Sequence, residues 1–108
     1  MLKPIRIDGS TGRVIHPDRT VRVTKQKSLG GPDTIRWHIV KGKSLAPFRV
    51  HFAHTPFDAS TPPQDITVSA GSGTSATFTV AASVDTYKYS IYDKHNNKTD
   101  DPSIIIVP

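Results

Sequence analysis

Short stretches in which apolar and polar residues alternate recur along this chain, and clusters of turn-forming residues separate them. Successive side chains of an extended strand point to opposite faces, so such alternation is typical of a strand with one buried face. Ile35, Trp37 and Ile39 would share one face, with Arg36 and His38 on the other. Helical periodicity is hard to find, and the sequence therefore predicts an all-β protein.

Eight strands are predicted from this alternation. They cover residues 5–7, 21–24, 34–40, 48–53, 65–69, 76–80, 87–92 and 103–107. All nine acidic residues are aspartate, and because aspartate favours turns whereas glutamate forms helices, this choice also argues against helices. The 108 residues contain no repeat and no linker, so we expect one domain, residues 1–108, built as a Greek-key β-sandwich of about 7–8 strands.

Three stretches in the last two thirds of the chain follow one another in an order that is also found in a known protein family. Residues 31–37 combine Gly-Pro-Asp with an alternating strand that carries an aromatic residue, and residues 47–52 place a proline before a strand. Residues 87–91 form an aromatic-rich strand, which a loop and a final apolar strand follow. Over roughly residues 30–108 this order resembles the cupredoxins, the Greek-key sandwich family of small blue copper proteins.

The resemblance does not extend to the copper ligands. A blue copper centre needs a cysteine thiolate, two imidazoles and usually a weak axial ligand. Phe48 stands where the family has its first histidine ligand, Ile91 stands where it has cysteine, and His95 lies near the second histidine position in a longer loop. The chain has no cysteine, and Met1 is its only methionine. The resemblance thus implies a copper-free member in which Phe48 and Ile91 fill the former metal pocket.

An immunoglobulin-like sandwich is the alternative topology. Asp85 precedes Tyr89 by four residues, which is similar to the tyrosine corner of those domains. Trp37 is placed to serve as their central tryptophan. The missing cysteine pair leaves this alternative open, since many such sandwiches lack a disulfide.

No enzyme and no cofactor are predicted. The serine, histidine and aspartate residues have no nucleophile-elbow context, a paired-carboxylate mechanism would have to use aspartate alone, and the glycine-rich residues 71–75 lack the lysine of a phosphate-binding loop. His51 and His54 lie three residues apart, which places them on opposite faces of an extended strand. We expect no metal site, with a surface copper or zinc site using His51, His54 or His95 as the alternative.

The positive charge is concentrated in the first half of the chain. Residues 1–49 hold eleven Lys or Arg against three Asp, whereas residues 50–108 hold three against six, which gives +8 and −3. Arg6, Arg22, Arg36 and Arg49 each project opposite the apolar residues of their strands, so on neighbouring strands they would form a positive stripe. Positive stripes attract acidic protein surfaces and phosphate backbones.

Another protein is the expected partner. The stripe itself is expected to be a solvated face that keeps the protein in solution, with contact to an acidic surface of the partner as the alternative. Binding to a nucleic acid or another polyanion is a weaker alternative, because the strand aromatics are predicted to face the core rather than to stack on bases. The opposed charges of the two halves also permit self-association that weakens with salt. These features together predict a non-enzymatic, copper-free cupredoxin-like domain that acts as a protein-binding or accessory module.

Nothing in the sequence predicts a membrane segment. No stretch approaches the ~20 apolar residues that a membrane-spanning helix needs. The first residues lack the apolar run of a secretory signal peptide, so the sequence as written indicates a soluble, cytoplasmic protein, or an exported one if a leader has been trimmed away.

Overall fold

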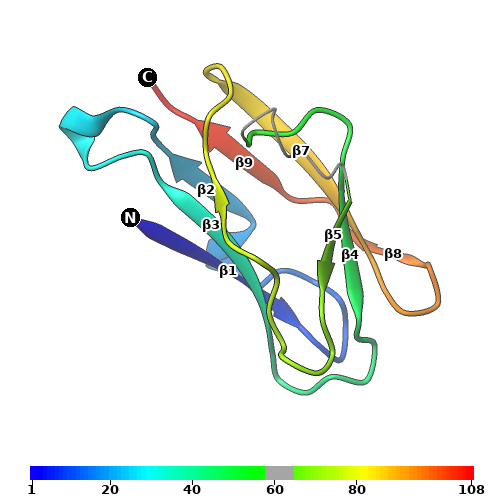
Figure 1. The fold of residues 1–108 in the computed structure, drawn as a ribbon. Helices are drawn as coiled ribbons and strands as arrows, with labels where there is room; N and C mark the ends of the chain where they lie inside the picture. The colour runs from blue at the N-terminus through cyan, green and yellow to red at the C-terminus, as the bar shows by residue number, and fades with distance from the viewer. Residues whose placement is uncertain (58–64) are drawn as a thin grey trace.

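Two β-sheets packed face to face form the framework of the molecule, shown here in a computed structural model that describes residues 1–57 and 65–108 (Figure 1). The described residues contain nine strands and no α-helix, which confirms the all-β prediction. The strands are β1 (Leu2–Asp8), β2 (Thr20–Val23), β3 (Thr34–Val40), β4 (Phe48–Phe52), β5 (Asp65–Val68), β6 (Phe78–Thr79), β7 (Asp85–Tyr92), β8 (Lys98–Asp100) and β9 (Ser103–Ile106). Two short 3-10 turns are η1 (His16–Asp18) and η2 (Lys27–Leu29).

Both sheets mix parallel and antiparallel pairs. The smaller sheet has the order β1-β3-β6, and the larger one has the order β2-β9-β7-β4-β5, with β8 attached to β7. The chain passes from β1 to β2 in the larger sheet and returns to β3, so that β1 and β3 lie side by side and parallel. β2 and β9 form the second parallel pair, and the other pairs are antiparallel.

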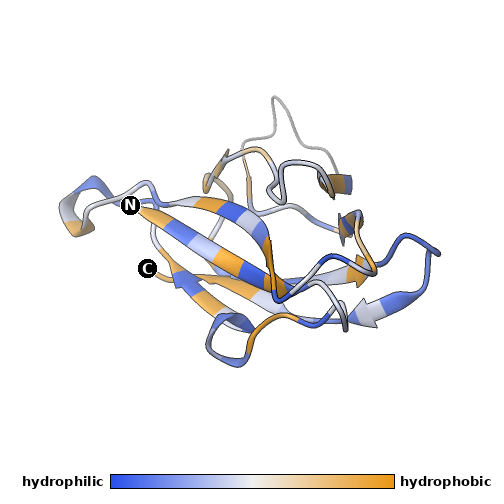
Figure 2. Cartoon of the chain, turned by 90° about the horizontal axis from the view of Figure 1, so that it is seen from below, coloured by the Kyte–Doolittle hydropathy of each residue, from blue (hydrophilic) through white to orange (hydrophobic). Residues whose placement is uncertain are grey.

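The alternation in the sequence sets the two faces of each strand, as the bands of Figure 2 show. In β3 the side chains of Ile35 and Trp37 are fully buried between the sheets, while those of Arg36 and His38 are only partly buried on the outer face. The same alternation buries Phe48 and Phe52 of β4. Burial of these apolar side chains is the main stabilising contribution in a sandwich of this size.

Aromatic rings occupy the middle of this core. Trp37 meets Phe52, Phe57 and Tyr89 edge-on or nearly so, at ring-centroid distances of 6.0, 6.1 and 5.5 Å. The indole Nε1 of Trp37 donates a hydrogen bond to the hydroxyl of Tyr89 at 3.4 Å, which gives both buried polar groups a partner. Burial raises the pKa of Tyr89, so this hydroxyl stays protonated.

A hydrogen bond from a tyrosine hydroxyl to the backbone closes the approach to β7. The hydroxyl of Tyr87 donates a 2.7 Å hydrogen bond to the carbonyl of Ser83, four residues upstream. The sequence pattern pointed to Tyr89 for this role, but Tyr89 faces inward and bonds Trp37 instead. The difference arises because Tyr87 lies near the start of the strand, where its side chain can turn back over the preceding loop.

The eight predicted strands are all present, and the structure adds a ninth. Residues 94–102 were expected to form a loop, but β8 pairs with β7 to make a hairpin. The carboxylate of Asp93 shapes its turn by accepting the backbone N–H groups of His95 and Asn97 at 2.9 and 3.0 Å. The predicted strand 76–80 is shorter than expected and retains only β6.

Two ion pairs fasten the connection between β1 and β2. Asp18 of η1 accepts the Arg6 guanidinium at 2.8 Å and the Arg6 backbone N–H at 2.9 Å. Asp100 of β8 pairs with Arg19 and also accepts the backbone N–H of Val14 at 2.8 Å. These carboxylates join segments that are far apart in the sequence.

No helix among the described residues is long and apolar enough to span a membrane.

Candidate binding surfaces

The positions that the cupredoxin resemblance assigns to copper lie inside the apolar core. Phe48 is 1% exposed and Ile91 is 0% exposed, on the inner faces of the adjacent strands β4 and β7. Both side chains are hydrocarbon, and neither supplies the imidazole or thiolate that a blue copper centre requires. His95 lies on the exposed β7–β8 hairpin. The residues at these positions therefore do not fit a copper ion.

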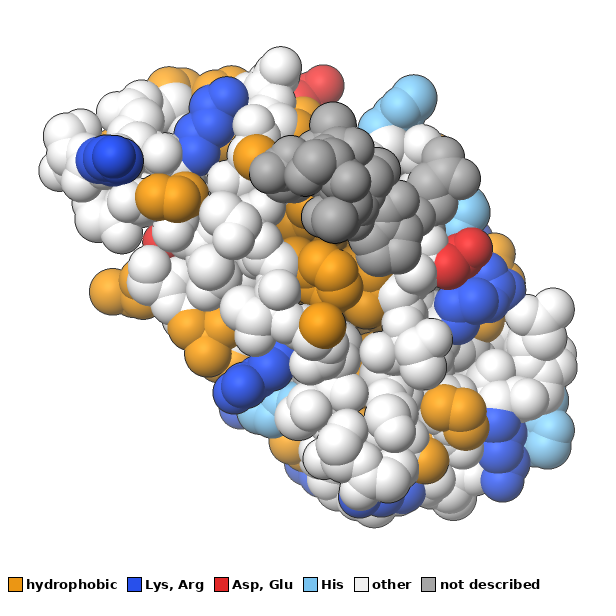
Figure 3. All heavy atoms as spheres, in the orientation of Figure 1, with side chains coloured by type: hydrophobic (Ala, Val, Ile, Leu, Met, Phe, Trp, Pro, Cys, Tyr) orange, Lys and Arg blue, Asp and Glu red, His pale blue; other side chains and the backbone are white. Residues whose placement is uncertain are grey.

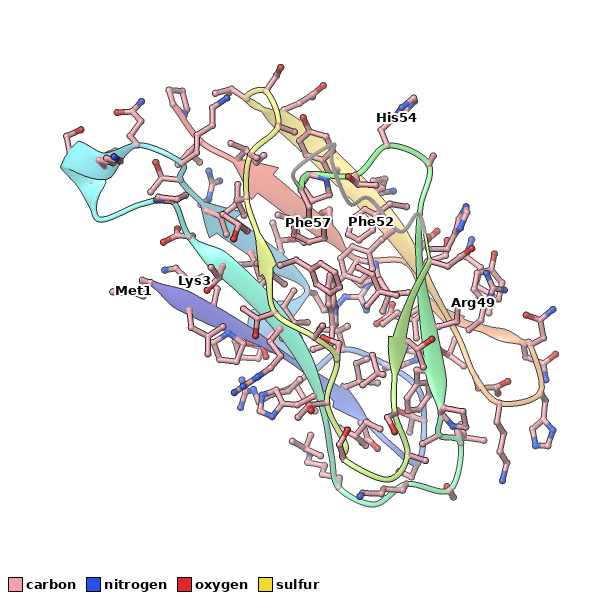
Figure 4. All side chains as sticks on the ribbon, in the orientation of Figure 1. Met1, Lys3, Arg49, Phe52, His54 and Phe57 are labelled. Carbon is pink, nitrogen blue, oxygen red and sulfur yellow. The ribbon has the colours of Figure 1, made fainter. Side chains whose placement is uncertain are left out.

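The three histidines of the alternative metal site lie apart. His51 is on the outer face of β4, where its Nδ1 is 2.8 Å from a carboxylate oxygen of Asp65. His54 lies beyond the end of β4 and points into solvent (Figure 4). Within residues 1–57 and 65–108, no three histidine, aspartate or other metal-ligating side chains come close enough to hold a metal ion.

The four arginines that sequence analysis singled out do not form one stripe. Arg6 and Arg36 lie on the adjacent strands β1 and β3, at positions two residues apart in the pairing register. Arg22 and Arg49 belong to the other sheet, where β9 and β7 separate their strands. The structure thus brings two of the four together and places the other two on a different sheet.

Two of these arginines are also engaged within the molecule. Arg6 is paired with Asp18, as described above. Arg49 donates to Asp65 at 3.0 Å and to Asn96 at 2.7 Å, and its guanidinium lies 4.2 Å from the ring centroid of Tyr92. Hydrogen bonds from His51 and Arg49 lower the pKa of Asp65. These arginines hold the fold's own surface together and are less available to a partner.

The aspartates of the described chain all serve local structure. Four of them form ion pairs with basic side chains: Asp18, Asp65, Asp100 and Asp101. The remaining carboxylates accept hydrogen bonds within turns or from nearby backbone N–H groups: Asp8, Asp33, Asp85 and Asp93. The described carboxylates are therefore engaged by groups of the same chain. On the face shown in Figure 3, acidic side chains are few among many basic ones.

Four cations that no ion pair of the described residues involves lie at one end of the sandwich, around the connection between β2 and β3: Lys3, Arg22, Lys25 and Lys27. Lys41 and Lys94 likewise form no ion pair there, but they lie toward the opposite end. Residues 24–33 between β2 and β3 project from the sheets as an arm, which both ribbon views show clearly (Figures 1 and 2). Residues 25–30 of the arm are all exposed, and they include Lys25, Lys27 and Leu29. At this end basic and hydrophobic side chains lie close together (Figure 3, upper left).

Backbone hydrogen bonds hold the arm in shape without a core of its own. At its base Thr24 and Asp33 are joined twice, from the Thr24 N–H to the Asp33 carboxylate at 2.9 Å and from the Asp33 N–H to the Thr24 carbonyl at 2.8 Å. Gly30 has a φ of 84°, a conformation that favours glycine. A Cβ on Gly31 would lie 2.9 Å from the carbonyl oxygen of Gln26, so this close turn also requires glycine.

A hollow of about 240 Å³ lies at the base of the arm. Its lining includes Lys3, Arg22, Leu29, Val23 and Val107. Lys3 belongs to the inner face of β1, in line with the buried Ile5 and Ile7, but at the open end of the strand (Figure 4). The alternation of β1 would place an apolar residue there. The strand was predicted only over residues 5–7, so Lys3 lay outside it, and its position two residues before Ile5 is the one signal in the sequence that could have pointed to the site.

A second hollow, of about 490 Å³, lies where β4 ends and β7 begins. His54, Asp85, Tyr87 and Lys88 contribute to its lining. Burial raises the pKa of Tyr87, so its hydroxyl remains protonated and continues to donate to Ser83. This hollow carries both signs of charge and therefore favours no class of partner.

Comparison of the sequence with models of known protein families gave no match, and neither did comparison with curated proteins. The surface chemistry of the chain has three distinctive features: a packed apolar interior, carboxylates that are engaged within the fold, and a basic arm with a hollow at its base.

Proposed function

We propose that the protein is a copper-free, cupredoxin-like sandwich that acts, without enzymatic activity, as a binding or accessory module for an acidic protein. The hydrocarbon side chains of Phe48 and Ile91 in the core support the copper-free part of this proposal. Rigid sheets with functional loops are a common design for binding proteins.

The proposal rests on a difference between acidic and basic side chains: the carboxylates are engaged within the fold, whereas several cations are not. The chain has fourteen Lys and Arg against nine acidic residues, a net charge of +5. Each described carboxylate already serves a turn or an ion pair, whereas no ion pair within the described part of the chain involves Lys3, Arg22, Lys25 or Lys27. Such a surface attracts a partner that supplies carboxylates.

The position of the aromatic rings favours a protein over a single-stranded nucleic acid. Binding of single strands relies on exposed aromatic side chains that stack on bases. The rings of Trp37, Phe48, Phe52 and Tyr89 are buried. Tyr92 is partly buried, and the guanidinium of Arg49 already lies over its ring.

The proposal predicts salt-sensitive binding to acidic peptides. A short fluorescein-labelled peptide in which Glu and Ser alternate on both sides of a central Leu should bind at low salt, as measured by fluorescence anisotropy. Its affinity should fall several-fold between about 20 and about 200 mM NaCl, because salt shortens the range of charge interactions. A peptide with Gln in place of Glu serves as the control. Absence of binding at low salt, or tighter binding of a single-stranded oligonucleotide, would contradict the proposal.

A further inference from the structure

We propose that the arm, residues 24–33, and the hollow at its base form one docking site for an acidic peptide segment that carries an apolar side chain. This inference rests on the proposed function and assigns it a place and a partner chemistry. The site joins two separate parts of the chain, because the hollow is lined from β1 and β2 as well as from the arm.

Four cations belong to the site, two in the lining of the hollow and two on the arm. Lys25 and Lys27 lie on the arm, Arg22 lies on β2 and Lys3 lies on β1. Asp33 is the one acidic residue in the lining of the hollow. Its carboxylate is buried, accepts the Thr24 N–H and lies 3.4 Å from the amino group of Met1. The Thr24 amide and the Met1 amino group already engage the Asp33 carboxylate. The four cations therefore have no ion pair with Asp33 and can meet a carboxylate of the peptide.

An apolar contact lies beside these cations. Leu29 is 59% exposed at the edge of the hollow, and Val23 and Val107 contribute to its lining. Protein interfaces commonly combine an apolar centre with a polar rim. The hollow, at about 240 Å³, is smaller than a typical small-molecule pocket of roughly 300–1,000 Å³. Its size suits one apolar side chain of a peptide better than a cofactor.

The arm is ordered before any partner arrives. Backbone N–H groups of Leu29, Gly30 and Gly31 bond to carbonyls of Gln26 and Lys27 at 2.8–3.1 Å, within a stretch of exposed residues. A loop that is already held in shape loses less conformational entropy on binding. The arm packs no apolar core of its own, so it presents its exposed side chains to solvent in the arrangement that these hydrogen bonds set.

Other occupants fit the site less well. A flat anionic membrane would meet the tip of the arm but could not reach Lys3, which lies recessed on the inner face of β1. A second copy of the chain would have to supply free carboxylates, and the described carboxylates already serve turns and ion pairs. A separate acidic peptide segment supplies both the carboxylates and the apolar side chain.

Paired charge reversals test the location of the site. The variant carrying Lys25→Glu and Lys27→Glu should bind the Glu/Ser peptide with a central Leu about tenfold more weakly, since two attractions become repulsions. The matched control carries Lys41→Glu and Lys94→Glu, which are exposed and produce the same change in net charge. Both lie near the opposite end of the sandwich, close to where β1 ends, so this variant should lose less than about twofold.

Two single variants test the hollow itself. Lys3→Met should weaken peptide binding without lowering the melting temperature, because an apolar side chain suits the inner face of β1. A residue that served only stability would show the opposite pattern. Leu29→Ser should weaken binding of the peptide with the central Leu but leave a peptide with a central Ser unaffected. Thermal melts followed by circular dichroism verify that each variant is folded.

The possible results distinguish failure of the docking site from failure of the proposed function. Equal loss for the arm variant and for the control variant would overturn the docking site but leave a diffuse acidic-partner function standing. Failure of the wild-type protein to bind the peptide would overturn both. Arm-dependent sedimentation with phosphatidylserine vesicles, or an arm-dependent dimer in analytical ultracentrifugation, together with weak peptide binding would assign the arm to a membrane or to a second copy instead.

Discussion

Phe48→Ala is expected to lower the free energy of unfolding by about 3–5 kcal/mol, the usual cost of deleting a buried aromatic ring. Phe48 is 1% exposed and lies in the same apolar core as Val50 and Ile91, so little solvent or free space is available to absorb the change. Urea denaturation followed by Trp37 fluorescence measures the effect. Val84→Ala is the matched control, since Val84 is 51% exposed and its truncation should cost less than about 0.5 kcal/mol.

The same denaturation curves test the copper-free interior. A ligand that binds only the folded state raises the apparent stability. Addition of Cu(II) should therefore leave the urea midpoint of the wild-type protein unchanged. A cost below about 1 kcal/mol for Phe48→Ala would mean that the space beside this ring is poorly packed. A midpoint raised by Cu(II) and lost in the Phe48 variant would place a metal there.

Asp100→Ala should lower the free energy of unfolding by about 2–3 kcal/mol at neutral pH, because it removes a charged acceptor from three donors: the Arg19 guanidinium and the N–H groups of Val14 and Asp101. The buried N–H of Val14 loses its partner, and Arg19 loses its carboxylate. The partly exposed Arg19 guanidinium can turn to water, which keeps the cost below that of a fully buried pair. Asp85→Ala, at an exposed position, is the control and should cost much less.

The effect of Asp100 should depend on pH. Burial acts to raise the pKa of Asp100, but hydrogen bonds from Arg19 and from the N–H groups of Asp101 and Val14 outweigh it and lower the pKa. A lowered folded-state pKa gives stability that is present above the unfolded value of about 4 and lost as the pH falls through the folded value. The difference between wild type and Asp100→Asn should therefore shrink below about pH 4. A difference that stays constant down to pH 2 would contradict this explanation.

Alternation in the sequence predicted the strands well where both faces of a strand are clearly distinct. The strand predicted at 34–40 has the same bounds in the structure, because its apolar face packs into the core and its polar face lies outside. The strand predicted at 76–80 is largely irregular. There the Ser75 hydroxyl accepts the Trp37 N–H at 3.0 Å, so a side chain replaces part of the regular strand pairing.

Features that depend on distant contacts were not visible in the sequence. β8 has no apolar alternation, and the turn at Asp93 and the pairing with β7 hold it in place. Period-2 patterns assign a side chain to a face but do not say which strands share a sheet. For this reason Arg6 and Arg22 could be placed on outer faces, while their separation into two sheets could not be predicted.

The binding site was largely hidden for a similar reason. Lys25 and Lys27 fall in a glycine-rich connection that predicts only a turn, and backbone hydrogen bonds turn that connection into an ordered arm. Lys3 lay outside the strand predicted over residues 5–7, and its position beside β2 arises from the fold. The burial of Phe48 and Ile91, in contrast, followed directly from their place in the alternation.

Chemical-shift mapping shows directly whether the acidic peptide docks at the arm. In a ¹⁵N-labelled sample titrated with the acidic peptide that carries a central Leu, we expect shifts confined to the arm, Lys3, Arg22 and Val107. Backbone signals of the distant β7–β8 hairpin should stay in place. Shifts that fall mainly on the outer face of β3 or on that hairpin, or no shifts at all, would overturn docking at the arm.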